Sequence, residues 1–127
     1  MPEVNTTKPV GLGPNQQLWV GALRSGKYTQ TRGALHNVET GGMCCLGVAS
    51  KLFLTNGGVR SFIGYYLYDG HHTLAPDYVA EKLCLYDEYG SANKGNSLIG
   101  LNDSGVSFAE IADLVEENPT HYFSSAK

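Results

Sequence analysis

One stretch near the middle of the chain, residues 41–53 (GGMCCLGVASKLF), constrains the fold more than any other. Its two glycines predict a turn, and residues 43–44 predict a short buried strand after that turn. The apolar side chains that follow recur at the three- and four-residue spacing of one helix face, at Cys45, Val48, Ala49, Leu52 and Phe53. We therefore expect the chain to cross the core once here and then to begin a central helix at Cys45.

Length and composition limit the class of protein. The 127 residues suffice for one domain, and the net charge of −3 is unlike the basic surface of a general nucleic-acid-binding protein. No apolar run approaches the ~20 residues that a membrane-spanning helix requires. The three cysteines do not form the pattern of a disulfide framework, and the first residues lack the apolar centre of a signal peptide. We therefore expect a cytosolic protein with reduced thiols, bound neither to membranes nor generally to nucleic acid.

The chain is expected to divide into an extended N-terminal arm, residues 1–14, and a single domain, residues 15–127. Three prolines make the arm unsuited to a helix or a core strand. An arm of this kind is usually held by another surface, and the segment 59–68 is rich in aromatic side chains that suit an interface. Both features favour a homo-oligomer, for which a two-fold dimer is the default.

Helix and strand signals are mixed along the domain. The predicted helices are 16–24, 45–53, one that begins at Pro76 and one that begins after Ser107. The last of these has the clearest local code, because Ser107 and Glu110 form a capping box. The predicted strands, rich in β-branched and aromatic residues, are 28–36, 43–44, 59–68 and 71–74. The expected fold class is therefore α+β, a single small domain with three to four helices packed on a short, mainly antiparallel sheet.

Three stretches, in this order and spacing, form a recognisable pattern: residues 19–28 (WVGALRSGKY), 44–48 (CCLGV) and 101–115 (LNDSGVSFAEIADLV). With them the chain resembles a group of small proteins encoded by tailed bacteriophages and prophages. The resemblance implies a phage gene product that acts in the cytoplasm of a bacterial host. It implies no settled activity and carries no catalytic residue across to this chain.

The adjacent cysteines suggest a nucleophile. The dipole of a helix favours the thiolate form of a cysteine at its start, and His71 or His72 would serve as the base. This order is similar to small papain-like hydrolases, but their local motif and a third orienting residue are absent. Free cysteines are also among the most often buried residues. Core packing is the favoured interpretation, and a cysteine hydrolase that uses Cys45 with His71 or His72 is the alternative.

Metal binding by these residues is not expected. Adjacent cysteines cannot readily both bind one zinc ion, since structural zinc sites favour a C-x₂₋₄-C spacing. Cys84 is isolated, and two adjacent histidines on a strand would point to opposite faces. We expect neither a metal nor a cofactor.

Cations around the end of the first predicted helix form the first candidate ligand site. Arg24, Lys27 and Arg32 lie close together in a chain with only nine basic residues, and Tyr28 adds an aromatic ring. Such residues suit a small anionic, nucleotide-like ligand through charge-assisted hydrogen bonds and stacking. The alternative is that they complement the helix end and face solvent.

Asn102 and Asp103, ahead of the last predicted helix, form the second candidate ligand site. They could hold a ligand beside the helix N-terminus. Alternatively, they build a compact turn, because both residue types bond to their own backbone. The turn is the favoured interpretation.

These observations favour a non-enzymatic function. The main hypothesis is a phage-encoded accessory protein that binds a host protein or sequesters a nucleotide-type signalling molecule, for counter-defence or host takeover. It is based on the lack of a recognisable catalytic group and on the cations between residues 24 and 32. A cysteine hydrolase and a minor structural protein of the phage particle are the alternatives.

Overall fold

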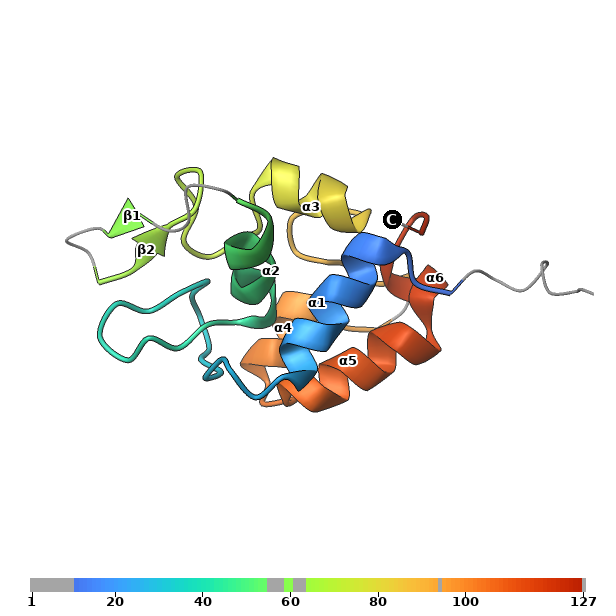
Figure 1. The fold of residues 1–127 in the computed structure, drawn as a ribbon, viewed down its shortest axis with the longest axis horizontal. Helices are drawn as coiled ribbons and strands as arrows, with labels where there is room; N and C mark the ends of the chain where they lie inside the picture. Colours follow the sequence, from blue (N-terminus) through green and yellow to red (C-terminus); the bar gives the residue numbers. More distant parts are fainter. Residues whose placement is uncertain (1–10, 55–58, 61–63, 94, 127) are drawn as a thin grey trace, which may run out of the picture.

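The computed structural model describes residues 11–54, 59–60, 64–93 and 95–126, and helices dominate in these ranges (Figure 1). The helices are α1 (Pro14–Arg24), α2 (Cys45–Phe53), α3 (Asp77–Leu83), α4 (Leu98–Asp103), α5 (Phe108–Glu117) and α6 (Pro119–Tyr122). The strands are β1 (Val59–Arg60) and β2 (Tyr66–Leu67), which pair with each other in antiparallel fashion. None of the described helices is long and apolar enough to cross a membrane.

Helix α2 lies at the centre of the molecule and packs against α1, α3 and α4. Every residue from Cys45 to Ser50 is buried, so its first turns have no solvent-facing side. Cys44 is the N-cap, and its Sγ accepts a hydrogen bond from the N–H of Gly47 at 3.4 Å. Gly47 is also needed for packing, because a Cβ there would overlap the carbonyl group of Leu35. The prediction of a central helix that begins at Cys45 is confirmed.

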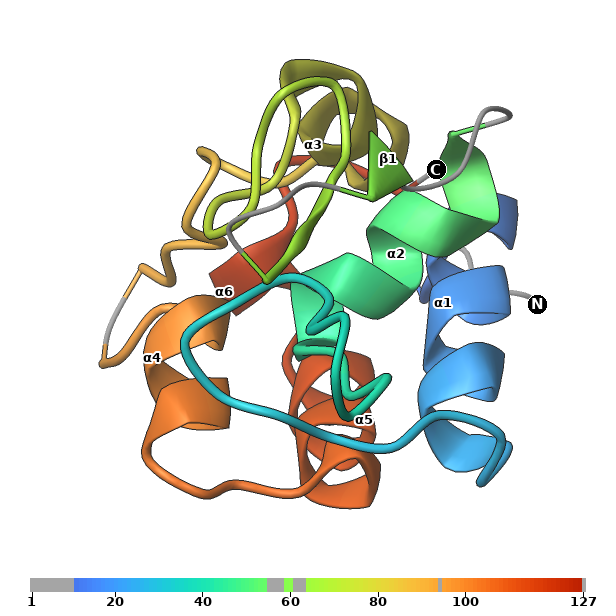
Figure 2. The same ribbon diagram turned by 90° about the vertical axis from the view of Figure 1, so that its left-hand side faces the viewer.

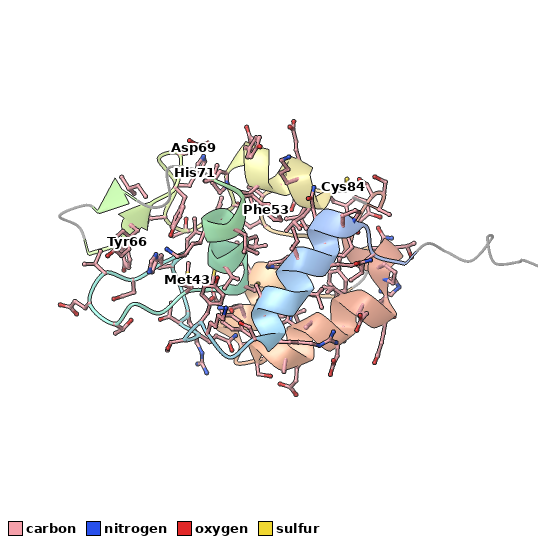
Figure 3. The ribbon with its side chains drawn as sticks, in the orientation of Figure 1. Met43, Phe53, Tyr66, Asp69, His71 and Cys84 are labelled. Carbon is pink, nitrogen blue, oxygen red and sulfur yellow. The ribbon has the colours of Figure 1, made fainter. Side chains whose placement is uncertain are left out.

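The hydrophobic core is formed by helices packed on helices. Trp19 of α1 is fully buried, and its Nε1 donates to the carbonyl oxygen of Cys45 at 2.9 Å, which ties α1 to the first turn of α2. The ring of Phe123 meets Trp19 edge-on, with ring centroids 6.2 Å apart. Other large buried side chains come from α2, α3 and α5, at Leu46, Val48, Leu83, Ile111 and Val115. Figure 3 shows the side chains that fill the space between these helices.

The predicted α+β fold, with helices packed on an antiparallel sheet, is wrong. In the described part of the chain, β1 and β2 have two residues each. Among the described residues of the predicted strands 28–36, 43–44, 59–68 and 71–74, the remaining β pairing is limited to isolated bridges, and residues 61–63 lie outside the described ranges. These bridges join Gln30 and His36 to Met43, Asn37 to Tyr65, and Tyr68 to His71.

Two of the segments that were expected to form the sheet contain a left-handed glycine, Gly33 with φ 78° and Gly64 with φ 95°. Gly41, Asp69 and Gly70 are also left-handed, but they lie in turns between the expected strands. A strand needs extended backbone at successive residues, so Gly33 and Gly64 interrupt the segments 28–36 and 59–68. Outside β1 and β2, the described β-branched and aromatic residues of these segments therefore belong to loops beside the helical core, because their β propensity reflects packing on a half-buried surface.

Two short helices, α4 and α6, were not predicted. Asn102 and Asp103, expected in a turn, are the last two residues of α4. At the other end of the chain, residues 1–10 of the expected arm lie outside the described ranges, and Pro14 is already the first residue of α1.

The capping box at the start of the last long helix, α5, is confirmed. Ser107 Oγ accepts a hydrogen bond from the Glu110 N–H, and Glu110 Oε1 accepts one from the Ser107 N–H, both at 3.1 Å. The following stripe of Phe108, Ile111, Ala112 and Val115 is buried.

The capping box and the stripe lead to a quantitative prediction. Replacing Ser107 with alanine should lower the free energy of unfolding by ~1 kcal/mol, because one N–H of the first turn loses its acceptor. Replacing the buried Ile111 with alanine should lower it by ~2–5 kcal/mol. Urea unfolding measures both, with Glu117→Ala as an exposed control on the same helix that should stay within ~0.5 kcal/mol of wild type. Equal midpoints for all four proteins would contradict this account of α5.

Candidate functional site

The side-chain amide of Asn102, at the end of α4, is buried and fully hydrogen-bonded. Its Oδ1 accepts from Gln30 Nε2 at 2.8 Å and from the Cys45 N–H at 3.1 Å. Its Nδ2 donates to the Thr31 carbonyl at 2.8 Å. Because Cys45 is the first residue of α2, its N–H has no acceptor within the helix. Asn102 therefore fixes residues 30–31 and the start of α2 to the end of α4.

Gln30 extends this network to α5. Its Nε2 also donates to the Val106 carbonyl at 2.8 Å, and its Oε1 accepts from the N–H of Phe108, the first residue of α5, at 3.0 Å. Figure 2 shows the path that makes this contact: the segment after α1 crosses α5 towards α4 and then returns to the start of α2. One pair of amide side chains thus holds the ends of three helices.

Residues 19–28, 44–48 and 101–115, the three stretches singled out in the sequence, meet at this network. Trp19 of the first stretch bonds to Cys45 of the second, and Cys45 bonds to Asn102 of the third. The three stretches are therefore joined to one another by hydrogen bonds in the interior.

A pocket of about 180 Å³ opens beside the network. It is lined by Gly33, Ala34, Cys44, Thr73, Leu74, Tyr89, Ile99 and Asp103, and we call it the Asp103 pocket. Ala34 and Cys44 are buried and form its floor, whereas Thr73, Tyr89 and Asp103 are exposed and form its rim. The loop before α2, the loop before α3 and helix α4 therefore all contribute to it.

Asp103 carries the only charge among the residues that line this pocket. Its Oδ1 accepts from the Gly33 N–H at 3.0 Å and from Asn102 Nδ2 at 3.4 Å, so the carboxylate is held in position. The pocket combines this charge with two hydroxyl groups on the rim and with apolar walls. Its volume is well below the ~300–1,000 Å³ of clefts that enclose drug-sized ligands, so it suits one side chain or a small group.

Burial decides the chemistry of the two central cysteines. The Cys44 side chain is buried, which raises its pKa to about 11 despite the N–H groups directed at its sulfur. Burial, and then the neighbouring Cys44, raises the pKa of Cys45 well above the usual value, and its Sγ donates to the Leu98 carbonyl at 3.6 Å. Both thiols are therefore protonated at neutral pH. This arrangement does not supply the thiolate that the hydrolase alternative requires.

The two candidate histidines contact other groups. His71 is exposed and its backbone pairs with Tyr68, and in Figure 3 it lies away from Met43, which leads into α2. The His72 ring stacks on Tyr65 with centroids 5.2 Å apart. None of the described interactions joins either ring to a cysteine. Within the described ranges, no three histidine, cysteine, aspartate or glutamate side chains are grouped so that they could hold a metal ion.

The cations of the first candidate ligand site have separate partners. Arg24 Nη2 lies 2.7 Å from Asp113 Oδ1 and 2.8 Å from Glu116 Oε1, so Arg24 ties α1 to α5. The Arg32 guanidinium lies against Gly105, where an added Cβ would be 3.1 Å from its Nη2.

Lys27 is exposed, and Tyr28 is half-buried against the core. Within the described part of the chain, no hydrogen bond, ion pair or ring contact brings Lys27, Tyr28, Arg24 and Arg32 together around one ligand. Of the second candidate pair, Asn102 is a buried structural amide and Asp103 lines a pocket.

Sequence reasoning missed the role of His36. Its Nδ1 lies 2.8 Å from the Tyr68 hydroxyl, and its ring stacks on Tyr66 with centroids 4.2 Å apart. Burial raises the pKa of Tyr68 to about 12, and burial together with Lys51 lowers the pKa of His36. A neutral histidine therefore joins the loop before α2 to β2 and to Tyr68, which follows β2 directly. No local signal identifies this pair, because the two residues are 32 positions apart.

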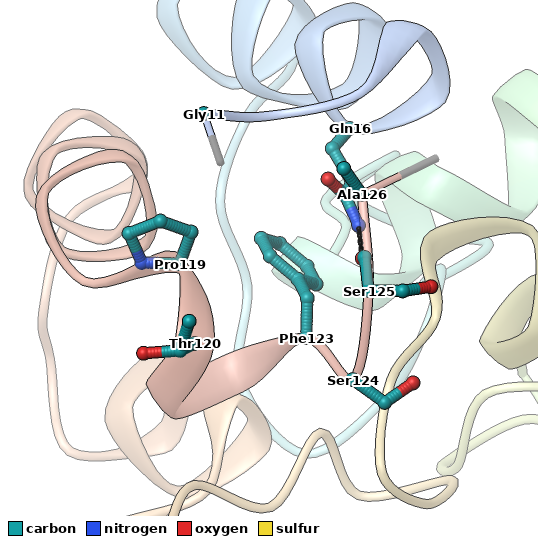
Figure 4. Close-up of a pocket in the computed structure, with 8 residues that line it drawn as sticks. All are labelled: Gly11, Gln16, Pro119, Thr120, Phe123, Ser124, Ser125 and Ala126. Carbon is teal, nitrogen blue, oxygen red and sulfur yellow. Dashed lines mark hydrogen bonds between the residues drawn. The ribbon is translucent and has the colours of Figure 1, made fainter. Parts of the chain in front are cut away.

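Two further hollows have no charged lining residue. Figure 4 shows one of about 100 Å³ between the start of α1, α6 and the C-terminal segment. Its Gln16 is buried and fully engaged, since Nε2 donates to the carbonyls of Leu83 and Ser125 at 2.8 Å and Oε1 accepts from the Gly13 N–H at 2.9 Å. The other hollow is an open depression over the exposed face of α1, at Pro14, Gln17, Leu18 and Gly21. The Asp103 pocket is therefore the candidate functional site.

The Asn102 network predicts a large effect of one substitution. Asn102→Ala should lower the free energy of unfolding by at least about 2 kcal/mol, because buried partners such as the Cys45 N–H lose their hydrogen bonds at a cost of ~1–3 kcal/mol each. Asn96→Ala is the matched control, since Asn96 is exposed and makes no described side-chain bond. Urea unfolding should show the loss only for Asn102→Ala. A change below ~0.5 kcal/mol would contradict the proposed role of this amide.

The burial of the thiols predicts their order of reaction. In the folded protein a thiol reagent at pH 8 should react first with Cys84, which is 8% exposed, because Cys45 has no exposed surface and Cys44 is 2% exposed. A Cys84→Ser variant should therefore label very slowly when folded and at both remaining thiols in denaturant. Rapid labelling of the folded variant, followed by mass spectrometry, would contradict this order.

Comparison with known proteins places the chain in a family. The model of the family described as Domain of unknown function (DUF8296) matches residues 15–119, which include α1 from its second residue, α2 to α5, the Asn102 network and the Asp103 pocket. No curated protein and no solved structure gives a significant match. Because the family model covers most of the chain, the protein belongs to the DUF8296 family.

Proposed function

We propose that the protein is a phage-encoded, non-enzymatic accessory protein that acts in the host cytoplasm by binding a host protein, in counter-defence or host takeover. Its phage origin rests on the resemblance carried by residues 19–28, 44–48 and 101–115. Its mode of action rests on the Asp103 pocket and the exposed residues around it.

The observation that carries the binding function is the position of Tyr89 at the rim of the Asp103 pocket. The Tyr89 side chain is 48% exposed. Its backbone is held, because Asp87 Oδ1 accepts from the N–H groups of Tyr89 and Ser91, both at 3.0 Å. An exposed tyrosine on a fixed backbone, next to a pocket, is typical of the anchors of protein interfaces, since little freedom is lost when it binds.

The contacts of the cations favour a protein partner over a nucleotide-type ligand. Arg24 is already paired with two carboxylates of α5. The candidate pocket carries a negative charge, from Asp103, and would repel a phosphate group. Its volume of about 180 Å³ is also too small for a nucleotide.

The state of the cysteines supports the non-enzymatic part of the proposal. A cysteine nucleophile works as a thiolate in contact with its substrate. Burial raises the pKa of Cys44 to about 11 and that of Cys45 well above its usual value, so neither thiol meets this requirement at neutral pH.

Affinity capture with three forms of the full chain tests the proposed function. Wild type, Tyr89→Ala and Tyr78→Ala are immobilised and exposed to a lysate of the bacterial host. Tyr78 is the matched control, because it is 46% exposed but lies on α3, outside the residues that line the pocket. We expect wild type and Tyr78→Ala to retain the same host protein and Tyr89→Ala to lose it.

Calorimetry with the purified host protein then measures the effect. Loss of an interface anchor should weaken binding by ~2 kcal/mol or more for Tyr89→Ala and leave Tyr78→Ala close to wild type. If wild type retains no host protein, or if all three forms bind it equally, the proposed function is wrong.

A further inference from the structure

We infer that the Asp103 pocket receives a single lysine side chain of the partner protein, an inference that rests on the proposed function. The pocket has a buried floor of Ala34 and Cys44 and one carboxylate on an otherwise uncharged rim. This arrangement suits an apolar stem that ends in a positive charge.

The charge of Asp103 is available to a partner. Arg32, which directly precedes the Gly33 that bonds to Asp103, has its guanidinium against Gly105, and no described cation forms an ion pair with Asp103. The carboxylate is also fixed in place, since Gly33 N–H and Asn102 Nδ2 both donate to its Oδ1. A partner charge therefore meets an acceptor that needs no rearrangement.

The hydrogen bonds of Asp103 favour lysine over arginine. An arginine fork binds a carboxylate best when both oxygens are free for two parallel hydrogen bonds. Here Oδ1 already accepts two N–H groups, whereas no described residue donates to Oδ2. A lysine ammonium is a compact charge that needs one such oxygen, and its other two hydrogens can be donated to hydroxyl groups.

The remaining lining residues complete this recognition. Leu74 and Ile99 are half-buried and provide apolar walls for a four-carbon stem, which lysine side chains bury readily while the charged end stays at the surface. The rim hydroxyls of Thr73 and Tyr89 are acceptors for the ammonium hydrogens, and the Tyr89 ring adds an attractive face for a cation.

The inference can be tested with a small probe on the full chain. The ¹⁵N-labelled protein is titrated with Nα-acetyl-lysine methylamide and, in parallel, with the corresponding norleucine and arginine derivatives. Norleucine has the same four-carbon stem without the ammonium group. We expect the lysine probe to shift the amide signals of Gly33, Ala34 and Thr73 and to bind about tenfold or more tightly than norleucine, with arginine in between.

Two variants locate the charge and the cavity. Asp103→Asn keeps the Oδ1 acceptor for Gly33 and removes the charge, so it should weaken the lysine probe about tenfold and leave the norleucine probe unchanged. Thr73→Leu, at an exposed rim position, fills the mouth of the pocket and should weaken both probes. Thr73→Leu keeps the test decisive if Asp103→Asn does not fold.

Equal binding of the lysine and norleucine probes would overturn the inference, and so would shifts confined to residues outside the pocket. Because the probe requires no host protein, this outcome leaves the proposed function standing. Failure of the lysate capture, in turn, contradicts the proposed function without altering the probe measurement.

Discussion

The fold depends on one buried amide group, the side chain of Asn102. It supplies an acceptor to the first N–H of α2 and a donor to the carbonyl of Thr31, and it meets Gln30, which in turn bonds to the first N–H of α5. A buried polar group that loses its partner costs ~1–3 kcal/mol, so these bonds are far more specific than the apolar contacts around them. Apolar packing makes the helices collapse together, and the amides determine which helix ends meet.

The same contacts place the candidate site. Asp103 follows Asn102 directly, so fixing one side chain in the interior brings the next to the surface, where it holds the Gly33 loop and lines the pocket. Cys44, in the pocket floor, shows how two effects on a thiol compete. Its position at the start of a helix lowers its pKa, but loss of solvent around the sulfur is the larger effect and raises the pKa to about 11. The pocket can therefore bind through Asp103, while its cysteine contributes only a surface.

The candidate site could be predicted only in part. Asp103 was a candidate ligand residue, but its partners in the pocket, Thr73 and Tyr89, come from distant loops with no common motif. The basic group at Arg24 was misleading for the opposite reason: its charges are close in sequence, yet the α5 carboxylates that hold Arg24 are 89 or more positions away. Closeness in sequence indicates a site only where the backbone makes neighbouring side chains converge.

The sequence by itself determined the helices whose signals are local: α2, through the spacing of apolar residues after Cys44, and α5, through its capping box. These signals lie within one or two helical turns, so they can be recognised without knowledge of any tertiary contact. Only the tertiary structure decided that the described residues of 28–36 and 59–68 pair no further than the β1–β2 ladder and isolated bridges, because left-handed backbone at Gly33 and Gly64 breaks the extended conformation. It also decided the Gln30–Asn102 contact, which joins residues 72 positions apart. Such a contact has no local signature, since its energy appears only when both amides are removed from water together.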